Sequence, residues 1–323
     1  MIEPFPFAGY PVAVLGLGPE GMASAQALAR SGAEVWAWDD DADRRAAATA
    51  AGLPLRDLFD LDWREPVSLV IEHTIAHGTA DARGAAGPHP LVAKARAAGC
   101  EVIADSELLA RTQREAGYVA IVSRRAASPA LDLFAHVFSV SGRETEVGGD
   151  AARPLLKLYP LELGGIYVLD MPPARAELTL SITFDAAVYL DLGSGAWPPC
   201  ATREETASAS RWVFHRQSGP KGAVVNVDDA EGRRICEELA GRGDQVVIPI
   251  SGRSRAPNGV YVAGGILYDD LGGRADAITD LPAPSEAHPA KTPLLAAAVY
   301  AAAVMMDIPK HAAMASLRSF FAI

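Results

Sequence analysis

The chain has 323 residues, of which 50% are apolar and 21% charged, and its formal net charge is −11. This length and composition predict about two globular domains with cores that need no disulfide or metal to hold them. The excess of acid disfavours nucleic acid and anionic membrane surfaces as partners.

Cysteine usage and the apolar runs predict a cytoplasmic protein. Cys100, Cys200 and Cys236 lie far apart without a C-x-x-C pair, as in a reducing compartment. Residues 1–7 lack the basic start and apolar stretch of a secretion signal. The longest apolar run, Leu294–Met306, is shorter than the ~18 residues of a membrane span, so a buried, alanine-rich helix is expected there.

Residues 1–116 alternate short apolar runs with helical patterns, which predicts a Rossmann-like domain with a parallel sheet. Strands are expected over 12–15, 34–38, 67–71 and 101–103, and helices over 21–31, 90–98 and 106–115. Gly32 and Gly99 stand where helices end and a left-handed residue is favoured.

A glycine-rich turn follows the first strand and opens the first helix. It reads Gly16-Leu17-Gly18-Pro19-Glu20-Gly21. Glycines in this position allow a pyrophosphate to approach the helix N-terminus, so the turn is a candidate nucleotide site. Two alternatives remain open, namely a nicotinamide cofactor and simple packing of the helix against the strand.

Acidic residues surround this turn. Asp39 ends the second strand, where an acid would meet a ribose hydroxyl, and Asp40 follows it. Glu20 lies within the turn and is expected to repel a diphosphate. The acids of 39–43 also predict the start of a solvated helix.

Residues 117–287 predict a second α/β domain, and 288–323 a short helical tail. Strands are expected over 118–122, 166–170, 186–190, 223–226 and 246–248, helices over 128–140, 204–215 and 231–241, and a hairpin over 259–268.

The turn after the first of these strands stands where a phosphate-binding loop would be expected. Such a loop needs glycines, a lysine for the terminal phosphates and a Ser or Thr for Mg²⁺. The turn reads Ser123-Arg124-Arg125-Ala126-Ala127-Ser128, so only Ser128 has a suitable side chain.

The order of several motifs resembles the Mur ligases, in particular the branch that adds D-glutamate to UDP-N-acetylmuramoyl-L-alanine in peptidoglycan synthesis. The matching segments are 14–18 with 38–40, 89–91 with 103–108, 147–149, 165–169, 224–229, 259–262 and His288 with the alanine-rich helix. The resemblance implies a first domain that holds the UDP-sugar, a second that binds ATP and a third that holds the amino acid.

The resemblance also shows which ligase features are missing. The family loop G-T-N-G-K-S/T falls on 123–128, so its glycines and lysine are absent. A metal-binding Glu is matched by Asp170, but prolines replace the serines after it, and 193–196 lacks the second metal patch. The carbamoylated lysine falls at about Ser210, and Asp150 replaces an Asn.

Asn226 matches an adenine contact, although it also fits a simple strand-to-helix turn. The chain stops at Ile323, where the family's third domain would begin, so the D-glutamate pocket is expected to be absent. His73-x-x-x-His77 has metal-like spacing, but it lies in a loop-rich stretch and is not taken as a metal site.

The sequence therefore predicts a catalytically inactive relative of these ligases, without catalytic or metal-binding residues and without bound ATP or Mg²⁺. The expected ligand is a UDP-N-acetylmuramoyl compound, and the expected partner a cell-wall synthesis protein or a second copy of the chain. The candidate ligand site comprises Gly16, Leu17, Gly18, Glu20, Gly21, Asp39 and Asp40, and the vestigial site Ser128, Asp170 and Asn226. The alternatives are an active ligase completed by another chain, an NAD-dependent oxidoreductase and a pure scaffold.

Overall fold

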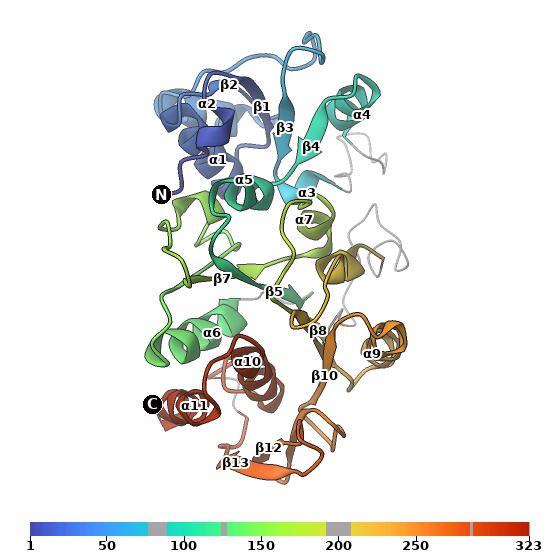
Figure 1. Cartoon of the computed structure of the whole chain (residues 1–323). Coiled ribbons are helices and arrows are strands. Elements are labelled where there is room, and N and C mark those ends of the chain that lie inside the picture. Colours follow the sequence, from blue (N-terminus) through green and yellow to red (C-terminus); the bar gives the residue numbers. More distant parts are fainter. Residues whose placement is uncertain (77–88, 124–127, 192–207, 285–286, 323) are drawn as a thin grey trace.

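The computed structural model describes residues 1–76, 89–123, 128–191, 208–284 and 287–322. Its strands form two sheets, which Figure 1 shows one above the other, with the four-stranded sheet and its helices at the top. The chain crosses from the first sheet to the second between α5 (Asp105–Thr112) and β5 (Gly117–Ser123). The predicted α/β fold with a helical C-terminal end is confirmed.

The first sheet has the order β2-β1-β3-β4 with all neighbours parallel. Its strands are β1 (Pro11–Leu15), β2 (Glu34–Trp38), β3 (Ser68–Ile71) and β4 (Glu101–Ile103), and its helices α1 (Pro19–Arg30), α2 (Ala42–Ala50), α3 (His73–Ala76), α4 (Pro90–Ala97) and α5. Asp41 caps α2 by accepting hydrogen bonds from the N–H groups of Asp43 and Arg44, which confirms the helix expected after the acidic run.

The second sheet has the order β13-β12-β11-β10-β9-β8-β5-β7-β6, in which β12 is antiparallel to both of its neighbours and the other neighbouring strands are parallel. Its further strands are β6 (Thr145–Gly148), β7 (Ile166–Asp170), β8 (Ala186–Asp191), β9 (Gly222–Asn226), β10 (Val246–Ser251), β11 (Val260–Ala263), β12 (Ile266–Asp269) and β13 (Asp276–Asp280). Gly264 and Gly265 have positive φ values of 58° and 79° and form the predicted hairpin turn between β11 and β12.

The helices of this part are α6 (Ser128–Val140), α7 (Pro173–Glu177), α9 (Ala230–Arg242), α10 (Pro293–Met305) and α11 (Lys310–Ala322), with short 3₁₀ helices at Phe5–Phe7, Leu155–Lys157 and Arg211–Phe214. The predicted alanine-rich helix is α10, and residues 296–303 of it are completely buried. Together with α6 and α11 it shares one hydrophobic core with the sheet, as Figure 1 shows below α6. No described helix is long and apolar enough to cross a membrane.

The structure differs from the sequence expectation in two places. A long helix was expected over 204–215, but of its described part residues 211–214 form a 3₁₀ helix. The edge strands β6 and β13 were not predicted, because their side chains are mostly exposed or half-buried and so lack the apolar alternation of a core strand.

Candidate functional site

The candidate site lies where helices from the two parts of the chain meet. Figure 1 shows α3, α5 and α7 between the two sheets, close to the start of α1. The carboxyl ends of β1, β2 and β3 point toward the same region, since parallel strands end at one edge of a sheet. The residues predicted from both parts of the sequence can therefore be placed relative to one another.

The glycine-rich turn is closely packed. Gly16 has φ +91°, a conformation that favours glycine, and a Cβ on Gly21 would lie 1.8 Å from the carbonyl oxygen of Gly16. The N–H of Leu17 donates to Oδ2 of Asp39 at 2.6 Å. These contacts join the turn to the end of β2, as a dinucleotide-type fold requires.

Glu72, which follows β3, lies against this turn. A Cβ on Gly18 would come within 2.2 Å of its Oε1, so a larger residue there would require the carboxylate to move. Burial and the nearby charge of Glu20 raise the pKa of Glu72, while Arg44 Nη1, 3.7 Å from Oε2, lowers it. Sequence reasoning missed Glu72, because a single acid after a strand carries no motif.

The acids at the end of β2 are also engaged. Oδ1 of Asp39 accepts from the N–H of Asp41 at 2.8 Å, and Arg44 Nη1 lies 3.4 Å from Oδ2. Asp40 Oδ2 lies 2.9 Å from Nε2 of His89, which caps α4. The guanidinium of Arg45 stacks 4.7 Å from the ring centre of Trp38 beside them, another feature without a sequence signal.

Glu20 points away from solvent and into the junction. Its Oε1 lies 2.8 Å from Nη2 of Arg175, and its Oε2 lies 2.8 Å from Nδ1 of His73. Burial raises the pKa of Glu20, but the hydrogen bond with His73 and the charge of Arg175 outweigh burial, so that its pKa is below the usual value. The negative charge expected within the turn is therefore compensated from α7.

Arg175 on α7 is the central residue of the junction and is completely buried. Its Nε donates to Oδ1 of Asp105 at 3.0 Å, and its Nη1 donates to the carbonyl oxygens of Gly149 and Asp170 at 2.6 and 2.8 Å. With Glu20, the guanidinium thus contacts four chain segments from both parts of the molecule. Nothing in the sequence around it, Pro172-Pro173-Ala174-Arg175, singled it out.

The vestigial residues are held by internal contacts. Ser128 begins α6, and its hydroxyl donates to Oδ2 of Asp150 at 2.8 Å. Asn226 ends β9, donates through Nδ2 to the carbonyl of Leu190 at 2.5 Å and accepts through Oδ1 from the N–H of Asp228 at 2.9 Å. The bonds of Asn226 are those of a strand-to-helix turn, while residues 124–127 and 193–196 lie outside the described part of the chain.

The residues around Asp170 do not suit Mg²⁺. Burial raises the pKa of this carboxyl to about 7, which makes it a poor anionic ligand at neutral pH. The adjacent carbonyl oxygens of Gly149 and Asp170 accept from Arg175. Within the described ranges no group of three or more His, Cys, Asp or Glu side chains could hold a metal, and His77 lies outside them.

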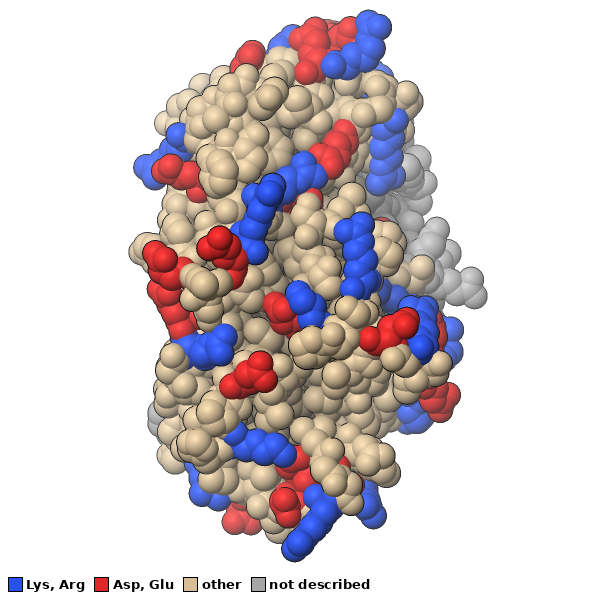
Figure 2. All heavy atoms as spheres, viewed as in Figure 1, with Lys and Arg blue, Asp and Glu red and all other residues tan. Residues whose placement is uncertain are grey.

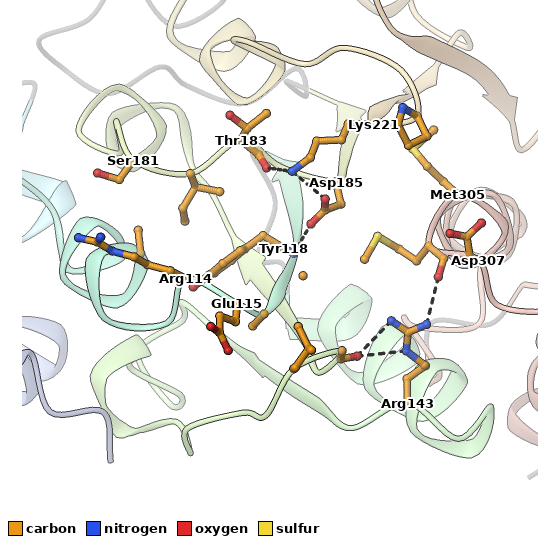
Figure 3. Close-up of a pocket in the computed structure, with 18 of the residues that line it drawn as sticks. Arg114, Glu115, Tyr118, Arg143, Ser181, Thr183, Asp185, Lys221, Met305 and Asp307 are labelled. Carbon is orange, nitrogen blue, oxygen red and sulfur yellow. Dashed lines mark hydrogen bonds and ion pairs between the residues drawn. The ribbon is translucent and has the colours of Figure 1, made fainter.

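A cavity of about 810 Å³ opens at the other end of the strands of the second sheet (Figure 3). It lies at the amino ends of β5, β8 and β9, away from Asp170 and Asn226. Two of its charged groups have internal partners: Lys221 Nζ contacts Asp185 Oδ1 at 2.8 Å, and Arg143 donates to the carbonyl of Gly164. Figure 2 shows acidic and basic side chains interspersed over the face in view. Neither this cavity nor this surface indicates a binding site for a charged ligand. The junction between the two parts of the chain therefore remains the candidate site.

The fold and the arrangement of the two sheets are those of Mur ligases. The structure of UDP-N-acetylmuramate:L-alanyl-γ-D-glutamyl-meso-diaminopimelate ligase from Neisseria meningitides superposes with a TM-score of 0.61 over 96% of this chain and 98% of that chain, at 14% identity. The alanine ligase MurC from Thermotoga maritima superposes with a TM-score of 0.54 over 96% of this chain and 68% of that chain, at 14% identity. No protein-family model matches the chain.

Relatives similar in sequence show to which of the Mur ligases the chain is related. UDP-N-acetylmuramoylalanine–D-glutamate ligase from Phenylobacterium zucineum is 34% identical over 99% of this chain and 68% of its own length. The ligase of the same name from a Caulobacter species is 34% identical over 97% of this chain and 67% of its own length. The chain therefore belongs to the UDP-N-acetylmuramoylalanine–D-glutamate ligase family, and the predicted resemblance is confirmed.

Proposed function

We propose that this chain is a non-ligating member of the family that binds a UDP-N-acetylmuramoyl compound in peptidoglycan precursor metabolism. The observation that carries the loss of ligation is the hydrogen bond of 2.8 Å between Ser128 and Asp150. It places a carboxylate at the N-terminus of α6, where ATP-driven ligation needs a phosphate.

The negative charge of Asp150 at the N-terminus of α6 disfavours binding of a nucleoside triphosphate there. Asp150 is further held by Nη2 of Arg153 at 2.8 Å. Burial raises the pKa of Asp150, but the hydrogen bonds from Arg153 and Ser128 outweigh it and lower the pKa, so the group is negatively charged at neutral pH. Phosphoryl transfer requires amides, a lysine and metal around the transferred group, and the loop 123–128 supplies no glycine or lysine.

The relatives' names and the glycine-rich turn support a UDP-sugar as the ligand. The turn has the backbone conformation that brings a helix N-terminus close to a pyrophosphate. Arg44 and Arg45 lie beside it at the start of α2 and supply positive charge. The carboxylate of Glu72 lies against Gly18 and would repel the diphosphate of this ligand. We therefore expect weaker binding than the same turn would give without an acid beside it.

Calorimetric titrations with UDP-N-acetylmuramoyl-L-alanine and with ATP-Mg²⁺ test both parts of this proposal. We expect heat of binding for the sugar nucleotide only, and no phosphate release when D-glutamate is added. Phosphate release that depends on ATP and D-glutamate would contradict the loss of ligation. Binding of neither compound would contradict the ligand and favour a scaffold.

Three alternatives predict other results. An active ligase completed by a second chain would release phosphate only with a co-purifying partner. An oxidoreductase would bind NADH, which a fluorescence titration detects. A scaffold would bind a cell-wall synthesis protein or a second copy of the chain without binding either nucleotide, which light scattering and co-purification would show. The acids around the glycine-rich turn favour the scaffold over the oxidoreductase, because NADH also carries a diphosphate.

A further inference from the structure

The guanidinium of Arg175 has an unusual position for an arginine. Such groups are almost never completely buried unless they are paired, since removing a charge from water is costly. Here two carboxylates, Glu20 and Asp105, lie 2.8 and 3.0 Å away, and two carbonyl oxygens complete its surroundings. Asp170 and His73 are the other titratable groups that act on this cluster.

We propose that Arg175 is a built-in cation that neutralises the buried carboxylates of Glu20 and Asp105 and locks the two parts of the chain together, so that this junction needs no divalent metal. Glu20 belongs to α1 and Asp105 to α5, both next to the first sheet, whereas Gly149, Asp170 and Arg175 belong to the second part of the chain. One side chain thus connects both parts. This inference does not depend on whether a UDP-sugar binds.

The geometry of the guanidinium explains why an arginine can join several chain segments at this junction. Its planar guanidinium directs five N–H donors outward in fixed directions. Here Nε and Nη1 donate to acceptors on three segments, and Nη2 forms an ion pair with Glu20 on a fourth. Mg²⁺ would need near-octahedral oxygen ligands and usually keeps water molecules. The space around Gly149 is already filled, because a Cβ there would lie 3.0 Å from Nη1 of Arg175.

Three further contacts, all made by Glu107, hold the same two parts together beside the arginine. The carboxylate of Glu107 on α5 is completely buried and accepts from the N–H groups of Leu180 and Ser181 at 2.7 and 2.9 Å, and from the hydroxyl of Ser181. Two places in the second part of the chain therefore bind to α5: Arg175 in α7 through Asp105, and residues 180–181 just after α7 through Glu107. Such a junction has no room to open as a hinge without breaking buried, charged hydrogen bonds.

Thermal unfolding and Mn²⁺ binding, detected by electron paramagnetic resonance, test the proposal. Arg175→Met removes the charge and keeps an unbranched side chain, and Arg114→Met, at an exposed arginine, is the matched control. We expect the wild type and R114M to have the same Tm in EDTA and in millimolar MgCl₂, and neither to bind Mn²⁺ tightly. R175M should lose roughly 10 °C in Tm.

A wild-type protein that binds Mn²⁺ tightly and gains Tm in MgCl₂, or an R175M variant as stable as R114M, would overturn the proposal. If R175M does not fold, Glu20→Gln provides a milder change, because it leaves Arg175 in place. Amide hydrogen exchange should then accelerate in both α1 and α7, since one ion pair joins them. Acceleration in α1 alone would show that the arginine does not couple the two parts.

Discussion

Glu72 and Gly18 are in such close contact that a methyl group on the glycine would overlap the carboxylate at 2.2 Å. The carboxylate thus lies where the proposed diphosphate would approach the helix N-terminus. A negatively charged ligand must either displace it or bind beside it.

Glu72→Gln should strengthen binding of UDP-N-acetylmuramoyl-L-alanine by roughly tenfold, because it removes a like charge near the diphosphate. Isothermal calorimetry at low salt measures the change. Glu65→Gln, at an exposed residue paired with Arg56, is the control and should leave the affinity unchanged. Equal affinities for E72Q and the wild type would show that the diphosphate does not approach this turn.

The two glycines of α9 should respond in opposite ways to alanine. A Cβ on Gly232 would lie 1.7 Å from the carbonyl oxygen of Asn226, so Gly232→Ala should destabilise the fold by roughly 3 kcal/mol or more. Gly241 has open space, and Gly241→Ala should stabilise by about 0.5–1 kcal/mol through helix propensity. Urea unfolding compares the two, and a similar loss in both would refute the contact with Asn226.

Glu107→Gln should lower the free energy of unfolding by roughly 2–4 kcal/mol, because the buried carboxylate accepts four hydrogen bonds, one of them from Arg111. Glu115→Gln, at an exposed position shortly after α5, should change it by less than about 0.5 kcal/mol. Denaturant titrations measure both variants. A neutral E107Q would mean that the junction does not depend on this charge.

Asp170 predicts a pH dependence of stability. Burial raises the pKa of this carboxyl from 3.8 to about 7 in the folded state, so the folded protein keeps a proton that the unfolded chain has lost. Its contribution to stability is complete below pH 3.8 and disappears as the pH rises to about 7, a difference of up to about 4 kcal/mol.

Asp170→Asn should remove this loss, so the variant should gain stability relative to the wild type as the pH rises through this window. Urea titrations at several pH values measure the free energy of unfolding of both proteins. The difference between D170N and the wild type separates the effect of Asp170 from that of other titrating groups. A difference that does not change with pH would show that Asp170 is ionised in the folded protein.

The fold could be predicted from the sequence because most of its strands are buried, and buried strands have a recognisable apolar pattern. Runs such as Val12–Leu15 and Ile166–Asp170 are apolar, β-branched and short, which is the pattern of parallel strands. The glycine-rich turn was also predictable, because its residues are consecutive and its conformation is local.

The junction could not be predicted in the same way. The partners of Arg175 come from positions 20, 105, 149 and 170, and the most distant of them, Glu20, is 155 residues away in the sequence. Glu20 was expected to repel a ligand, whereas the fold supplies it with a cation from another segment. Such tertiary pairing has no period or motif that a single sequence reveals.

The burial of α10 has a consequence for how the protein is made. One face of the second sheet, including Val119, Val188 and Val224, packs against the residues of this helix, which begins only at Pro293. During synthesis, most of the sheet leaves the ribosome before the helix that covers it exists. This apolar face of the sheet is therefore exposed, and prone to aggregate, until α10 has been synthesised and can pack against it.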